Sequence, residues 1–85
     1  MRLVRITEVK PMAGYRLWLR FDDGRTGVVT FSPEEFTGVL EPLRDPRFFE
    51  KVFVEPDFGA LAWPGEIELD PLVLYQRATG ENVPT

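Results

Sequence analysis

Three acidic residues near the C-terminal end are spaced so that they could bind a divalent cation. Glu66, Glu68 and Asp70 alternate along the chain, and alternate residues of an extended segment point to the same side. Converging carboxylates are typical ligands of Mg²⁺ or Ca²⁺ and would suit a metal-dependent hydrolase. In the alternative, Ile67 and Leu69 face the core, the acids face water, and Asp70 caps a helix. We favour this second interpretation and expect no metal site.

Asp22 and Asp23 form a second acidic pair, of the kind that can carry out general acid–base catalysis. They are followed by Gly24, and an Asp-Gly step is a strong signal for a hairpin turn. Asp side chains commonly accept hydrogen bonds from the backbone of such turns. Because a turn tip is exposed to water, we interpret both acids as turn residues rather than catalytic groups.

The chain of 85 residues contains no His and no Cys. It therefore lacks the imidazole base, the thiolate nucleophile and the usual ligands of zinc, haem and iron–sulfur clusters. Together with the structural roles assigned to the acids, this composition predicts a protein that is not an enzyme, with no catalytic residues and no cofactor.

The clearest candidate for binding lies in the segment 15–21, where apolar and polar residues alternate. Arg16, Trp18 and Arg20 fall on one face of the expected strand, opposite a face of large apolar residues. Such a face could contact a protein partner or a second copy of the chain, because Trp and Arg are enriched at interface centres. It could also stack on bases and neutralise phosphates. In a third interpretation, short helices cover this face and Trp18 joins a second layer of the core.

Trp63 is a further candidate for partner binding, since a Trp beside Pro64 and Gly65 can form an exposed rim. The alternative is that Trp63 packs as a lid over a small core, because large aromatic side chains are usually well buried. In that case we expect Tyr75 to pack beside it, with the phenol hydroxyl bonded to a backbone carbonyl.

These residues must be positioned by strands and turns, since alternating apolar residues recur along the first third of the chain. Three strands are predicted there, over residues 2–9, 15–21 and 26–31, separated by a break at 10–14 and by the Asp-Gly turn. Their short connections indicate an antiparallel meander. The segments 51–55 and 60–63 predict a second hairpin, which we expect to extend the same sheet.

Three Pro-containing segments have the pattern of helix starts, in which a capping residue precedes Pro at the first helical position. They are Ser32-Pro33, where Glu35 would complete a capping box, Asp45-Pro46 and Asp70-Pro71. The sequence thus predicts an α+β fold: a small antiparallel β-sheet with two or three short helices. We expect a single domain over residues 1–76 and a polar, frayed tail over 77–85.

Charge is divided unevenly along the chain, whose net value is −4. Residues 1–27 carry a net charge of +3 and residues 28–85 a net charge of −7. An acidic total disfavours broad nucleic-acid affinity, because that affinity depends on the number of phosphates neutralised. We therefore expect nucleic acid to bind only weakly or through a partner. With no apolar run of about 20 residues, we expect a cytoplasmic location and no membrane contact.

Three motifs occur in a fixed order along the chain. The first is Phe21-Asp22-Asp23-Gly24, before a Pro-containing helix start. The second is Pro42-Leu43-Arg44-Asp45-Pro46 followed by Phe48 or Phe49, and the third is Trp63-Pro64, then Leu69-Asp70-Pro71, then Leu74-Tyr75. This order resembles the small bacterial family catalogued as domain of unknown function 2442, and the resemblance covers about residues 2–76.

The resemblance implies a compact α+β domain without assigned catalysis, in members that stand alone or are fused to DNA-binding helix-turn-helix modules. Some members are encoded beside another small protein, in an arrangement similar to a toxin–antitoxin pair. Where the family reads Trp-Pro-Asn-Gly-Ala-Asp-Leu-Asp-Pro-Asp, this chain has Gly65 in place of the Asn and Leu72 in place of the last acid. Since the chain leaves no room for a fused helix-turn-helix, we expect any DNA contact to require a partner.

We therefore expect a non-enzymatic interaction domain that binds a small partner protein or a second copy of itself. Its contacts would be Arg16, Trp18 and Arg20, with Trp63 as a further one. The alternative function is a nucleic-acid-associated regulator, or the antitoxin-like half of a two-protein pair.

Overall fold

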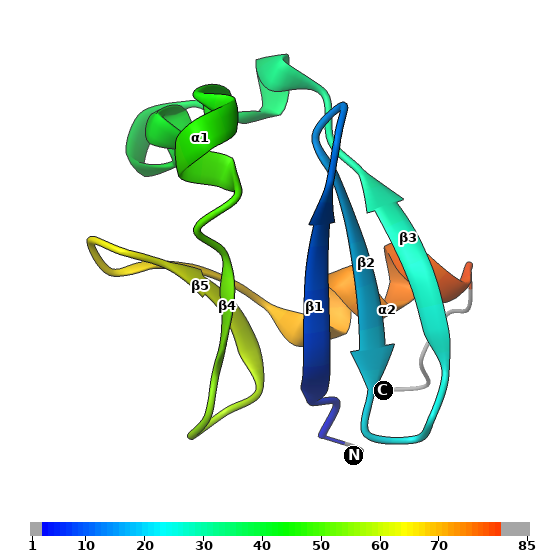
Figure 1. The fold of residues 1–85 in the computed structure, drawn as a ribbon. Helices are drawn as coiled ribbons and strands as arrows, with labels where there is room; N and C mark the ends of the chain where they lie inside the picture. Colours follow the sequence, from blue (N-terminus) through cyan, green and yellow to red (C-terminus); the bar gives the residue numbers. More distant parts are fainter. Residues whose placement is uncertain (1–2, 81–85) are drawn as a thin grey trace.

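Two three-stranded antiparallel sheets make up most of the fold in the computed structural model, which describes residues 3–80 (Figure 1). The first sheet has the order β1-β2-β3, with β1 at Ile6–Met12, β2 at Arg16–Phe21 and β3 at Thr26–Thr30. The second has the order β4-β5-β6, with β4 at Phe53–Glu55, β5 at Ala60–Trp63 and β6 at Ile67–Leu69. The short helices are η1 and η2, both 3₁₀, at Pro33–Glu35 and Gly38–Arg44, and α1 and α2 at Pro46–Phe49 and Pro71–Thr79. The predicted α+β class is confirmed.

The alternation in β2 produces a sheet with one buried face. Leu17, Leu19 and Phe21 are at most 1% exposed and face the core. The turn between β2 and β3 forms where Asp-Gly predicts it, with Gly24 at φ +87°. The Asp23 carboxylate accepts a hydrogen bond from the Arg25 N–H at 2.9 Å, so this acid has the turn role expected of it.

Strand β1 begins later and ends later than the sequence predicts. It passes through Pro11, which lies opposite Leu17, and ends at Met12. Pro is tolerated here because β1 is the outermost strand of its sheet, and a Pro whose missing N–H points away from the neighbouring strand removes no ladder bond. Pro11 thus suggests the end of a strand in the sequence, but the pairing of β1 with β2 continues past it to Met12.

The second hairpin does not extend the first sheet, as we expected it to, but forms a sheet of its own with β6. The two sheets meet where the Ile6 N–H donates to the Gly59 carbonyl at 2.8 Å. The Arg5 guanidinium donates to the carbonyls of Pro56 and Asp57 at 2.7 and 3.0 Å. Gly59 has φ +68°, and a Cβ there would lie 2.6 Å from the Cβ of Arg5, so glycine permits this close approach.

The helix starts carry the caps that the sequence predicts. The Asp45 carboxylate accepts from the Arg47 N–H at 3.0 Å, and the Asp70 carboxylate accepts from the Leu72 N–H at 2.8 Å. In the capping box of η1, the Glu35 carboxylate accepts from the Ser32 N–H at 2.8 Å. Each contact satisfies a backbone donor that a helix start leaves unpaired.

The C-terminal helix α2 runs to Thr79, so residues 77–79 of the predicted tail are helical. Residues 81–85 lie outside the described part of the chain. Arg77 ties α2 to η1 through an ion pair with Glu35 at 2.9 Å. Hydrogen bonding from Arg77 lowers the pKa of the Glu35 carboxyl, and the Ser32 N–H adds to this effect. No helix within residues 3–80 is long and apolar enough to cross a membrane.

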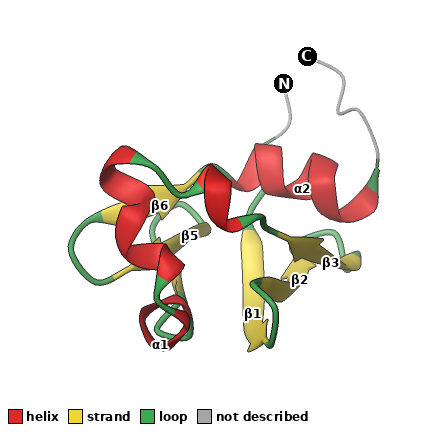
Figure 2. Cartoon of the chain, turned by 90° about the horizontal axis from the view of Figure 1, so that it is seen from above, coloured by secondary structure: helices red, strands yellow, loops and turns green. Residues whose placement is uncertain are grey.

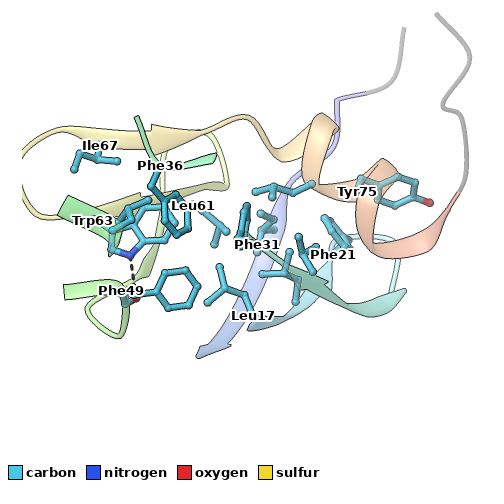
Figure 3. Close-up of a cluster of buried hydrophobic side chains, with 14 of the residues drawn as sticks. Leu17, Phe21, Phe31, Phe36, Phe49, Leu61, Trp63, Ile67 and Tyr75 are labelled. Carbon is cyan, nitrogen blue, oxygen red and sulfur yellow. Dashed lines mark hydrogen bonds between the residues drawn. The ribbon is translucent and has the colours of Figure 1, made fainter. Parts of the chain in front are cut away.

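The core is shared by both sheets and is covered on one side by α2 (Figures 2 and 3). Phe31, Phe36 and Phe49 form its aromatic centre, with ring centroids 5.7 to 6.1 Å apart. Gly27 on β3 brings the end of α2 close, because a Cβ there would lie 2.5 Å from the Ala78 carbonyl oxygen. The first sheet therefore has one face against the core and α2, and one face directed outward.

Candidate functional site: the outer face of the first sheet

Nine side chains project from the side of the first sheet that faces away from the core, and we call this surface the outer face. They are Glu8, Lys10 and Met12 on β1, Arg16, Trp18 and Arg20 on β2, and Thr26, Val28 and Thr30 on β3. Figure 2 shows α2 on the opposite side of this sheet, and no other described element lies over the outer face. The helical cover considered for Trp18 is therefore not present within residues 3–80.

Trp18 lies at the centre of the outer face. Across the two ladders it is opposite Lys10 on β1 and Val28 on β3. The Lys10 ammonium nitrogen is 5.1 Å from the centre of the indole ring, and the Arg20 guanidinium carbon is 5.6 Å from it. Both distances are within the range of cation–π attraction. The ring is half-buried because these long side chains, rather than a second core layer, lie against it.

Glu8 joins the two cations beside the ring. Its carboxylate oxygens lie 3.5 Å from the Lys10 ammonium and 3.7 Å from the Arg20 guanidinium. Exposed ion pairs of this kind contribute little to stability, on the order of 0 to 1 kcal/mol. Their effect here is to keep both cations near the ring, and the outer face retains a net charge of +2 from its three cations and one acid.

Apolar and charged side chains lie side by side on the outer face, both at its Arg16 end and at its centre. Arg16 is exposed, and its Nε–H donates to the Ala13 carbonyl at 2.8 Å, which leaves the terminal nitrogens of the guanidinium directed to solvent. Met12 is 38% and Val28 43% exposed. Apolar surface therefore lies between cations, a combination suited to a partner that offers both carboxylates and apolar groups.

Alternation along residues 15–21 predicts Arg16, Trp18 and Arg20 on one face, and the structure brings them together there. Glu8, Lys10 and Met12 were not predicted on this face, because the break expected at residues 10–14 ended the first strand too early. The signal was present: these three residues alternate with Val9 and Pro11, which is the period of a strand.

Trp63 does not belong to this surface, which corrects its expected role as a partner contact. It is 1% exposed, and its indole N–H donates to the Phe49 carbonyl at 3.0 Å (Figure 3). Its position on β5 places it inside the core, where the buried N–H has the partner it requires. A buried side chain of this kind is not accessible to another protein.

Tyr75 was expected beside Trp63 and lies elsewhere. Its ring packs edge-on against Phe21 at 4.9 Å between centroids. Its hydroxyl donates to the Asp23 carboxylate at 2.7 Å rather than to a backbone carbonyl. Asp23 thus links the β2–β3 turn to α2, a structural role that its neighbours in the sequence did not reveal.

The three acids near the C-terminal end do not gather into a site. Glu66 occupies the β5–β6 turn with φ +65°, Glu68 is exposed on β6, and Asp70 caps α2. No group of three or more acids within residues 3–80 is placed to hold a metal ion. The cap formed by Asp70 and the exposed position of Glu68 agree with the structural roles expected of these two acids.

Comparison with known proteins shows which fold and which family this chain shares. No curated protein matches this chain. A solved structure, "Putative DNA Binding Protein NE0471" from Nitrosomonas europaea ATCC 19718, is similar to it with a TM-score of 0.77 and 24% sequence identity. The match covers 91% of this chain but 50% of that one, so the chain spans half the length of the solved protein.

The family comparison agrees with the order of motifs found in the sequence. The matched region, residues 6–80, takes in both sheets and α2. The chain belongs to the family described as "Protein of unknown function (DUF2442)".

Proposed function

We propose that this chain is a non-enzymatic interaction domain that binds a partner protein through its outer face. The observation that supports the proposal is the placement of Trp18 at the centre of a sheet face that no element within residues 3–80 covers, between Lys10 and Arg20 and beside exposed Val28. Trp and Arg are the residue types that contribute most to protein interfaces. The net positive charge of this surface favours a partner with acidic groups.

A protein partner fits this surface better than a nucleic acid does. Single-stranded nucleic acids need an open aromatic face on which bases can stack, whereas Lys10 and Arg20 lie against the Trp18 ring. Glu8 would be repelled by a phosphate, and the chain as a whole carries a net charge of −4. A protein partner needs no open ring face, and its apolar side chains can pack on exposed Met12 and Val28, so its binding depends less on charge than that of a nucleic acid.

The proposal is tested by asking whether the capture of a partner protein depends on the Trp18 side chain. Tagged wild type, Trp18→Ala and Val39→Ala would be used to capture proteins from a lysate, with quantification by mass spectrometry. Val39 is the matched control, because it is 80% exposed and lies far from the outer face, on η2. We expect a captured protein whose recovery falls at least about tenfold with Trp18→Ala and is unchanged with Val39→Ala.

Sedimentation of the same three proteins covers the case in which the partner is a second copy. A wild-type dimer that dissociates with Trp18→Ala would support the outer face as the interface. If wild type is a monomer and no captured protein depends on Trp18, the outer face is not an interaction surface.

A second candidate is a nucleic-acid-associated role, including the antitoxin-like half of a two-protein pair. It is favoured by the net +2 charge of the outer face and by the fold shared with the Nitrosomonas europaea protein. Fluorescence anisotropy with duplex DNA and with single-stranded RNA, at about 50 mM salt, tests it, because phosphate binding is strongest at low salt. No binding by the domain, alone or with a captured partner, would remove this candidate.

A further inference from the structure

The two edges of the first sheet differ in how they are protected. β1 carries Pro11, which has no N–H, and an irregularity in its register between Ile6 and Glu8. The Ile6 N–H is also occupied by the Gly59 carbonyl of the second hairpin. Proline, bulges and covering segments are the usual means by which proteins prevent an edge strand from pairing with another chain. The β1 edge is therefore closed.

The β3 edge has neither a Pro nor an irregular register, and the hydrogen bond from Arg77 of α2 to the Thr30 carbonyl covers only one end of it. Its sequence, from Thr26 to Thr30, contains no Pro and no charged residue, and its register with β2 is regular. Figure 1 shows β3 as the outermost strand on this side of the sheet. Unprotected edges of this kind accept an additional strand.

The hydrogen bonds of the ladder show which backbone groups are available. The Phe21 N–H donates to the Arg25 carbonyl, and the Phe31 N–H donates to the Tyr15 carbonyl, both at 2.9 Å. Antiparallel pairing alternates, so the odd-numbered residues bond to β2 and the even-numbered residues direct their N–H and C=O groups outward. The outward residues are Thr26, Val28 and Thr30.

The outward groups of β3 are almost unoccupied. Arg77 donates to the Thr30 carbonyl at 2.8 Å, and a carbonyl can accept a second hydrogen bond. Within residues 3–80, no hydrogen bond reaches the outward groups of Thr26 or Val28. The backbone N–H and C=O groups of these two residues are therefore spaced to pair with an additional strand.

The neighbouring side chains indicate what such a strand would carry. Thr26 lies opposite Arg20 and Thr30 opposite Arg16, with Val28 between them at 43% exposure. Strands lie about 4.8 Å apart, so a strand added beside β3 would lie about 9.6 Å from β2. Arg20 and Arg16 can span that distance if they turn away from Glu8 and from the Ala13 carbonyl, which they contact in the free domain. The outer face would then meet an acidic residue at each end of the added strand and an apolar residue at its centre.

We propose that the partner of the outer face binds as an extended acidic segment, which adds a fourth, antiparallel strand along the β3 edge. The inference rests on the proposed function and specifies its partner class: a segment with the pattern acid-x-apolar-x-acid. Its backbone pairs with Thr26, Val28 and Thr30, while its acids contact Arg20 and Arg16. This mode combines main-chain hydrogen bonds for affinity with side-chain contacts for specificity.

A short peptide provides the probe. A fluorescein-labelled, capped peptide of sequence TETVTET has the required pattern, and TKTVTKT is its charge-reversed control. Anisotropy titrations of the full chain are expected to show saturable binding of the first and binding at least about tenfold weaker for the second. Replacing Arg16 and Arg20 together by Ala should reduce this preference, since it removes the two cations.

Two further variants separate backbone pairing from simple charge attraction. Val28→Pro removes an outward N–H without removing a bond to β2, and Val28→Thr keeps that N–H. We expect about tenfold weaker peptide binding with Val28→Pro and little change with Val28→Thr. Methylating the amide nitrogen of the peptide's central Val should weaken binding similarly, whereas methylating a neighbouring Thr should not, and this comparison needs no change in the protein.

Three results would overturn the inference. The first is that TETVTET shows no saturable binding, and the second is that the two N-methylated peptides bind equally well. The third is that wild type forms a dimer that dissociates with Val28→Pro, which would assign the β3 edge to a second copy of the chain. If any of these occurs while protein capture still depends on Trp18, the proposed function stands and only the edge-strand mode is wrong. If capture does not depend on Trp18, the proposed function is wrong as well.

Discussion

Replacing Gly27 by Ala would test the close approach of α2 to strand β3. In an ordinary strand this change stabilises a protein by about 0.4 to 1 kcal/mol, because it restricts the unfolded chain. At Gly27 the new Cβ would lie 2.5 Å from the carbonyl oxygen of Ala78 and 3.0 Å from its Cβ. The structure therefore predicts the opposite sign.

The magnitude follows from the kind of atom that is in the way. The carbonyl oxygen belongs to the backbone near the end of α2, so it can move only if the helix shifts. Overpacking of this type costs about 1 to 3 kcal/mol, and the gain from the unfolded chain offsets about 0.4 to 1 kcal/mol of it, so the midpoints of the two ranges give a net loss of about 1.3 kcal/mol. For a domain of this size, that corresponds to a Tm lower by roughly 5 to 10 °C.

Thermal and urea unfolding, followed by circular dichroism, would measure the effect. The control is the same substitution in a chain that ends at Arg77, in which the Ala78 atoms are missing. There Gly27→Ala should be neutral or slightly stabilising, as for an unobstructed strand position. The predicted clash with Ala78 would be contradicted if wild type and Gly27→Ala were equally stable in the full chain. It would also be contradicted if Gly27→Ala lowered the free energy of unfolding equally in the full and the shortened chain.

Three other substitutions test the structural contacts. Glu35→Gln should destabilise the domain near neutral pH, because it removes the carboxylate that pairs with Arg77. Arg77 lowers the pKa of Glu35 in the folded state, so the stabilisation from this ion pair is lost as Glu35 is protonated, and the difference from wild type should fade as pH falls below 4.5. Urea unfolding across this pH range measures the difference. Trp63→Phe leaves the buried Phe49 carbonyl without its donor, and we expect a loss of about 1 to 3 kcal/mol in urea unfolding. Gly59→Ala adds a Cβ 2.6 Å from another side chain at φ +68°, so its Tm should fall clearly.

Local signals in the sequence predicted the elements whose partners are close along the chain. The strands 15–21 and 26–31 were recognised by alternation, and the structure places β2 and β3 within them. The Asp-Gly turn and the caps at Asp45 and Asp70 were also recognised, because a turn or cap is completed within a few residues.

Contacts between distant segments could not be predicted in this way. The second hairpin formed its own sheet because β6 supplied a third strand and Gly59 contacts Arg5, a residue far away along the chain. Tyr75 found Phe21 and Asp23 instead of Trp63 because α2 crosses the first sheet. Neither contact can be predicted from the alternation or spacing of residues along the sequence.

The two tryptophans show what each level of structure decided. Alternating residue types were enough to place Arg16, Trp18 and Arg20 on one face of a strand, and composition was enough to exclude His and Cys chemistry. The packing of distant segments then enclosed Trp63 in the core and left Trp18 on a face that nothing within residues 3–80 covers. The two outcomes differ because alternation fixes the side of a strand on which a residue lies, whereas burial depends on which distant segment packs against that side. The exposed backbone groups of Thr26 and Val28 on the β3 edge were decided in the same way, because no other segment within residues 3–80 bonds to them.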